Sequence, residues 1–98
     1  MAYDPGAIDA TLAAAVGDDP ALIAELRDAF LDSAHRVVEA LDAAAENNDD
    51  WRAAAWRLKG LAASFGAVRL MALADEAAQA QPGDIVTINR IRRAIERL

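Results

Sequence analysis

Four clusters of turn-forming residues divide this sequence, and the apolar residues between them recur with helical spacing. The clusters read "GDDP" at 17–20, "ENNDD" at 46–50, "FGA" at 65–67 and "QPGD" at 81–84. Glycine suits the left-handed position that follows a helix, and an aspartate suits the N-cap of the next one. The intervening segments predict helices over 5–16, 20–46, 49–64, 67–80 and 85–97, with Asp19 and Asp84 as N-caps and Pro20 in a first turn.

The apolar positions form one stripe along each long segment, as expected for helices packed around a shared core. In the second and fifth segments these positions are Leu22, Leu26, Ala29, Phe30, Ser33, Val37, Leu41 and Ala44, and Ile85, Ile88, Ile91, Ile95 and Leu98. With 98 residues, 55% of them hydrophobic, the chain has the size of one domain, and no segment alternates like a strand. We expect an all-α fold over 1–98: an antiparallel up-down-up-down four-helix bundle, with a short extra N-terminal helix across one end.

Composition excludes several classes of function. The chain has no cysteine and one histidine, which excludes disulfides, thiolate chemistry and a multi-histidine metal site, and we expect no metal and no cofactor. The net charge of −6 argues against nucleic-acid binding, and the basic sequence "NRIRRAIERL" is interpreted as a solvated helix face. No apolar run approaches the ~20 residues of a membrane span, and the start lacks signal-peptide features. We therefore expect a cytoplasmic protein that does not bind membranes.

Two tryptophans lie on the third predicted helix, and the helical wheel separates them. Counted at ~100° per residue, Trp51 falls on the stripe around Leu58, whereas Trp56 lies ~160° from Leu58. The predicted buried stripe is Trp51, Ala54, Ala55, Leu58, Leu61, Ala62 and Phe65, and the outer face around Trp56 carries Asp49, Arg52, Lys59, Gly60 and Ala63. Glycine costs about 1 kcal/mol relative to alanine inside a helix, so Gly60 indicates that something approaches this face. The alternative is that Trp56 is an incidental surface aromatic.

The sequence "AAAWRLKGLAASFGAVRLMALADEAA" resembles the signature of histidine-phosphotransfer (HPt) domains of bacterial phosphorelays. The residues that match the signature are Leu58, Lys59, Gly60, Ala62, Ala63, Phe65, Gly66, Ala67, Leu70 and Leu73. Upstream, "GDDPALIAELRDAF" and "NNDDWRAAA" resemble the family's second-helix start and the stretch before the signature, so the resemblance runs from about Gly17 to the end of the fourth helix. It implies a four-helix bundle with the phospho-accepting histidine at position 56. It also implies that Lys59 offsets phosphate charge and that Gly60 gives a receiver domain access.

The chain departs from the family at this position, where it has Trp56. A neutral imidazole can take a phosphoryl group on its free nitrogen lone pair, whereas the indole nitrogen can only donate a hydrogen bond. His35, on the second helix, has no Lys-Gly pair after it and is interpreted as a solvated surface residue. We therefore expect no catalytic residue and no enzyme activity.

The remaining expectation is a docking module of two-component signal transduction. Its partner would be the receiver domain of a response regulator or hybrid histidine kinase, or a kinase, and the module would carry no phosphoryl group. Trp56 would be the apolar anchor within a positive rim that faces the receiver's carboxylates. The predicted partner-binding residues are Arg52, Trp56, Arg57, Lys59, Gly60 and Ala63. A monomer is expected. Two alternatives stay open: a bundle that uses this face for homodimerisation or another contact outside phosphorelays, and an engineered His-to-Trp form of an active phosphotransfer protein.

Overall fold

The computed structural model describes residues 6–17 and 19–98, and over these ranges the chain forms helices and no strand. The helices are α1 (Gly6–Val16), α2 (Pro20–Ala43), α3 (Asn48–Ser64), α4 (Val68–Gln79) and α5 (Ile85–Glu96). They correspond one to one with the predicted segments, and the all-α prediction is confirmed. Pro5, the predicted start of the first helix, lies outside the described residues.

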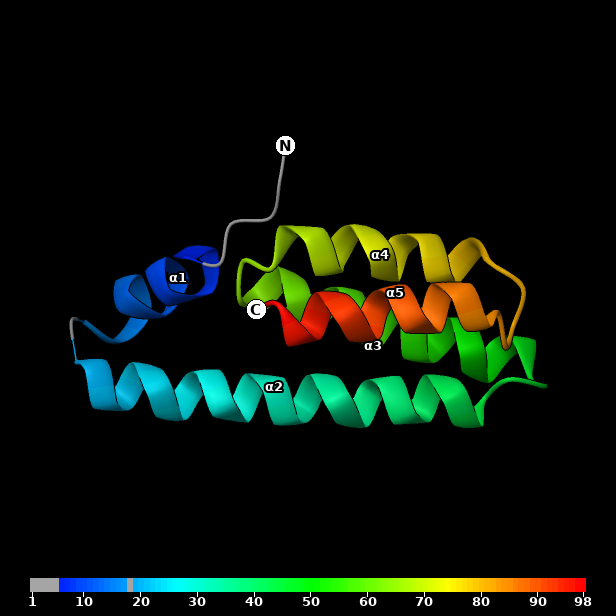
Figure 1. Cartoon of the computed structure of the whole chain (residues 1–98), viewed down its shortest axis with the longest axis horizontal. Coiled ribbons are helices and arrows are strands. Elements are labelled where there is room, and N and C mark those ends of the chain that lie inside the picture. The colour runs from blue at the N-terminus through cyan, green and yellow to red at the C-terminus, as the bar shows by residue number, and fades with distance from the viewer. Residues whose placement is uncertain (1–5, 18) are drawn as a thin grey trace.

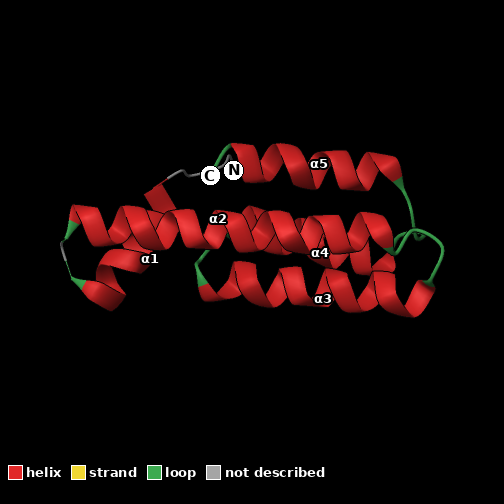
Figure 2. Ribbon diagram, turned by 90° about the horizontal axis from the view of Figure 1, so that it is seen from below, coloured by secondary structure: helices red, strands yellow, loops and turns green. Residues whose placement is uncertain are grey.

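The four helices α2–α5 form a ring in which successive helices are antiparallel (Figure 1). α2 packs against α3 and α5, and α4 packs against the same two helices, so that α2 and α4 lie diagonally across the ring. This arrangement is the predicted up-down-up-down bundle. α1 lies at one end of the molecule beside the N-terminal part of α2, which extends beyond the other three helices (Figures 1 and 2).

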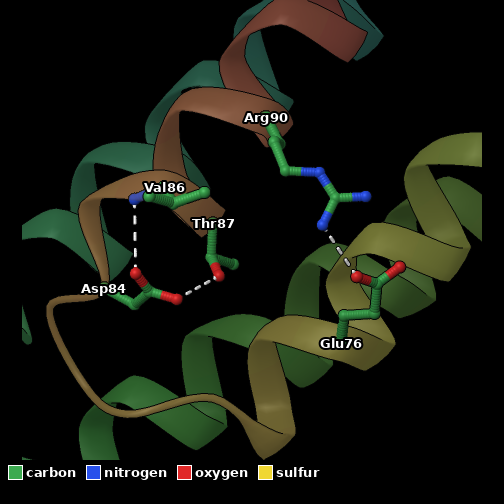
Figure 3. Close-up of polar contacts among 5 residues, drawn as sticks. All are labelled: Glu76, Asp84, Val86, Thr87 and Arg90. Carbon is green, nitrogen blue, oxygen red and sulfur yellow. Dashed lines mark hydrogen bonds and ion pairs between the residues drawn. The ribbon is translucent and has the colours of Figure 1, made fainter.

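Short side chains and glycines set the ends of the helices as the sequence predicts. The Asp19 carboxylate accepts hydrogen bonds from the N–H groups of the first turn of α2, and Asp84 accepts from the Val86 N–H and the Thr87 hydroxyl at the start of α5 (Figure 3). Gly17 has a φ of +83°, the left-handed conformation expected after a helix. These caps satisfy N–H groups that a helix leaves without backbone partners.

α2 ends at Ala43, three residues before the predicted Glu46. The Ala44 N–H bonds to the carbonyls of Ala40 and Leu41, which tightens the last turn, and the Asn47 N–H then bonds back to the Ala44 carbonyl. Asn47 caps α3 by accepting from the Asp50 N–H at 3.0 Å. The chain therefore needs 44–46 for the turn that reverses its direction.

The core runs through the ring and contains most of the predicted apolar positions. Its largest fully buried side chains are Trp51, Phe30, Leu41, Leu58, Leu70, Leu73, Ile88, Ile91 and Ile95. Phe30 of α2 meets Phe65, which follows α3, with ring centroids 4.6 Å apart. Aromatic pairs at this separation contribute about 0.5–1.5 kcal/mol beyond the area they bury. This contact joins α2 to the α3–α4 turn.

Three predicted core residues are exposed instead. Leu22 and Ala29 lie on the solvent side of α2, where the buried stripe is centred on Ala34 and Val38. At ~100° per residue, Ala29 and Ala34 lie ~140° apart around α2. Because both residues are alanine, their hydrophobicity does not show which of the two sides faces the core. Ile85 is the first residue of α5 and is exposed.

Candidate docking site

The two tryptophans of α3 occupy opposite environments, as the helical wheel predicts. Trp51 is fully buried, and its indole Nε1 donates a hydrogen bond of 2.8 Å to the Ala77 carbonyl on α4. The side chain thus fills the core and satisfies its one polar group. Trp56 is 48% exposed. The large apolar surface of Trp56 is available to a partner, whereas that of Trp51 is used in folding.

The surface of α3 around Trp56 carries small and basic side chains, with Asp49 exposed about two turns earlier. Arg52, Gly60 and Ala63 are exposed, and Lys59 is partly buried. A Cβ added at Gly60 would meet no heavy atom of a neighbouring group within 4 Å. No contact within the described chain therefore requires glycine here, although glycine weakens the helix. Gly60 lies four residues after the exposed Trp56, on the next turn of α3.

Lys59 joins Trp56 to α4, which the sequence did not predict. Its Nζ lies 4.8 Å from the centroid of the Trp56 ring and 3.2 Å from Oδ1 of Asp75. The first distance is that of a cation–π contact, which contributes about 0.5–1 kcal/mol at an exposed site. Part of the positive charge expected at this rim is therefore already compensated by a carboxylate of the same chain. Sequence reasoning missed Asp75 because it depends on the register between α3 and α4.

Arg57 lies on the side of α3 that faces α2. It lines two shallow hollows between these helices, of about 350 and 410 Å³. The larger hollow also includes Gly60, Arg36 and Ser64, whose hydroxyl donates to the Gly60 carbonyl at 3.0 Å. The predicted rim is therefore spread around α3, with the open space of Gly60 near its middle.

The six predicted binding residues all belong to α3 but do not share one face: Lys59 is partly buried against Asp75 of α4, and Arg57 lies on the side of α2. His35 lies on α2 and is exposed. Among the described residues, no group of three or more histidine, cysteine, aspartate or glutamate side chains could hold a metal ion. Within the same residues, no helix combines the length and apolar character needed to cross a bilayer.

The ring of antiparallel helices defines the class of the protein as a four-helix bundle. The chain belongs to the Hpt domain family, whose family model matches residues 25–98. This match covers most of α2 and all of α3, α4 and α5, and includes every residue of the region around Trp56. Hpt domains are phosphotransfer carriers that interact with receiver domains and kinases in phosphorelay signalling, so the chain is a module of such signalling. No curated protein and no solved structure matches the chain.

Proposed function

We propose that this Hpt-family protein docks the receiver domain of a response regulator or hybrid histidine kinase and carries no phosphoryl group. The observation that carries the proposal is the half-exposed Trp56 beside the open space at Gly60. The resemblance to the HPt signature implies that the family's phospho-accepting histidine corresponds to position 56, and the proposal rests on this correspondence. In this proposal the surface of α3 around position 56, which presents the histidine in other members of the family, binds the receiver domain but takes no part in phosphoryl transfer.

The chemistry of the indole supports the second half of the proposal. Phosphoryl acceptance at a nitrogen needs an available lone pair, and the indole lone pair belongs to the aromatic ring. His35, the only histidine in the sequence, is exposed on α2, whereas Lys59 and Gly60 lie on α3. A nucleophile requires an arranged environment, and within residues 6–17 and 19–98 no hydrogen bond, ion pair or ring contact orients the His35 side chain. We therefore propose a binding role, without enzymatic activity.

The composition of the face supports the first half. Tryptophan and arginine are the residues that most often dominate interface energy, and Trp56 lies near Arg52 and Arg57, neither of which has an ion pair within residues 6–17 and 19–98. A receiver active site is rich in carboxylates, as the family resemblance implies. Positive charge around an apolar anchor complements such a surface and speeds encounter.

Binding of the purified domain to receiver domains from the same organism tests the proposal. Trp56→Ala should weaken binding by at least ~2 kcal/mol, about 30-fold, which is the range of an interface anchor. Val86→Ala is the matched control because Val86 is also an exposed apolar residue but lies at the start of α5. Arg52→Glu should slow association most strongly at low salt. Equal affinity of the wild type, Trp56→Ala and Arg52→Glu would place the docking surface elsewhere.

Phosphoryl transfer is tested separately. Incubated with an active kinase and phosphorylated receivers, the wild type should acquire no acid-labile, base-stable label. Trp56→His should acquire it, because the smaller imidazole fits at an exposed position and Lys59 lies one helical turn away. Label on His35 of the wild type would overturn the assignment of position 56.

The same exposed indole could instead join two copies of the chain. We propose a monomeric single domain spanning 1–98 that acts in the cytoplasm. Sedimentation equilibrium across a wide concentration range distinguishes the two states. A concentration-dependent mass that Trp56→Ala abolishes would support the homodimer and contradict receiver docking as the use of this face.

A further inference from the structure

Four arginines come together between α4 and α5, on a surface separate from the Trp56 region. Arg69 is the second residue of α4. Arg90 and Arg93 lie on α5, and Arg97 is the C-cap that follows it, so the three are spaced by three and four residues. Such spacings place side chains on one face of a helix. With Ala94, these arginines line a hollow of about 140 Å³. The basic sequence near the C-terminus is therefore part of a shared concave surface and more than a solvated helix face.

The positive charge in this hollow is largely uncompensated. Arg90 reaches across to α4 and pairs with Glu76 at 3.0 Å (Figure 3). Arg69, Arg93 and Arg97 have no ion pair with any residue of the described ranges. The whole chain has ten Lys and Arg residues and a net charge of −6. Four of these ten basic residues line one hollow, and only Arg90 among them pairs with a carboxylate of the described ranges. The hollow therefore attracts anions strongly, although the protein as a whole is acidic.

The start of α4 adds to this field. Arg69 lies in its first turn, and the N-cap Ala67 makes no side-chain hydrogen bond. A helix N-terminus carries a partial positive charge, and a cation placed there is unfavourable unless an anion offsets it. The arginine positions at the C-terminal end of α5 are favourable by the same argument. The N-terminus of α4 therefore disfavours the charge of Arg69, whereas the C-terminus of α5 favours those of Arg93 and Arg97, and all three side chains line the same hollow.

We propose that this hollow binds a multiply charged phosphate group, either as the free ion or as part of a small soluble ligand. Guanidinium groups donate paired hydrogen bonds that match the geometry of phosphate oxygens, and an anion with several oxygens can bridge more than one arginine. A single carboxylate would leave most of the charge uncompensated. The volume of about 140 Å³ suits a compact anion with its water. None of its lining residues lies on α3, the helix that carries Trp56.

Titration with inorganic pyrophosphate and with inorganic phosphate, followed by amide chemical shifts at constant ionic strength, tests the proposal. We expect saturable binding with the largest shifts at the start of α4 and along the second half of α5. Arg93→Ala and Arg97→Ala should each weaken binding about fivefold, the upper range for one exposed charge pair. Arg93→Lys should weaken it as well, because lysine keeps the charge but loses the paired donors. Glu76→Gln should strengthen binding by releasing Arg90.

Arg92→Ala is the matched control for the site. Arg92 lies next to Arg93 in sequence but pairs with Asp42 of α2 and does not line the hollow. Its replacement should leave the affinity unchanged, and circular dichroism should show that all variants keep the wild-type helix content. An equal loss of affinity in Arg92→Ala and Arg93→Ala would mean general charge attraction, and a response that sodium chloride reproduces would mean an adventitious ion only. Binding to vesicles that contain phosphatidic acid, without binding of free pyrophosphate, would replace the soluble ligand by a membrane surface. Each of these results overturns the proposal.

Discussion

Replacing Trp51 should destabilise the protein far more than replacing Trp56, although the two residues are five positions apart on one helix. A large aromatic side chain buries about 150–250 Å², and Trp51 is fully buried. At about 25 cal/mol per Å² its transfer from water contributes about 4–6 kcal/mol, an upper estimate because the unfolded chain already buries part of this surface. Trp51→Ala should therefore lower the free energy of unfolding by about 3–5 kcal/mol.

The hydrogen bond of the indole allows a finer variant. Trp51→Phe keeps most of the ring but loses the donor to the Ala77 carbonyl. That carbonyl also accepts from the Ala80 N–H at 3.1 Å, so it is not left without a partner. The cost should therefore be about 1–2 kcal/mol, from one lost hydrogen bond and a small cavity. This variant also keeps the prediction testable if Trp51→Ala is too unstable to purify.

Urea denaturation followed by far-ultraviolet circular dichroism measures both variants, with Trp56→Ala as the control on the same helix. The control should stay within about 0.5 kcal/mol of the wild type, because the lost contact with Lys59 is offset by the better helix propensity of alanine. The order of destabilisation should be Trp51→Ala, Trp51→Phe, Trp56→Ala. A loss below about 1 kcal/mol for Trp51→Ala, or a larger loss for Trp56→Ala, would refute the assignment of the two faces of α3.

Three further predictions concern single residues described above. Gly60→Ala should raise the free energy of unfolding by about 0.5–1 kcal/mol in urea denaturation, because the added methyl meets open space, and should weaken receiver binding if the gap is needed for docking. Asp19→Ala should lower the melting temperature and cost about 1 kcal/mol through loss of the α2 N-cap, and Asp19→Asn should restore most of it. Asp75→Asn should change stability by less than about 0.5 kcal/mol, because its pair with Lys59 is partly exposed. Combined with Trp56→His, Asp75→Asn should speed phosphoryl uptake from a phosphorylated receiver severalfold by freeing Lys59, and an unchanged rate would mean that Lys59 takes no part.

The features that the sequence predicts well are those that depend on neighbouring residues. Gly17, Asp19 and Asp84 act at helix ends through groups a few positions away, so their roles follow from local chemistry. The opposite faces of Trp51 and Trp56 follow from the period of one helix. These signals determined the number of helices, their order and the exposed indole.

The features that the sequence did not predict require knowledge of how the helices lie against each other. The contact of Lys59 with Asp75 joins residues of α3 and α4, and the arginine hollow combines Arg69 with residues near position 93. Neither is visible until the register of antiparallel helices is set by core packing. The misplaced stripe of α2 has a different cause: alanine is frequent on both sides of that helix, so hydrophobicity alone does not distinguish Ala29 from Ala34.

The attachment of α1 to one helix gives the molecule two levels of cooperativity. α2 has 24 residues, twice the 12 of α4 or α5, and therefore extends beyond them. Among the described helices α1 packs only on α2, where its residues Ile8 and Leu12 are buried. Detaching α1 breaks one interhelical contact, whereas opening the ring breaks several at once, so α1 can unfold locally at a lower free energy than the whole protein. The family match begins at residue 25, so it covers most of α2 and the other three helices of the ring but not α1. The backbone amide hydrogens of α1 should exchange with solvent through this partial opening. The amide hydrogens of α2–α5 near the buried Trp51 should exchange only when the entire domain unfolds.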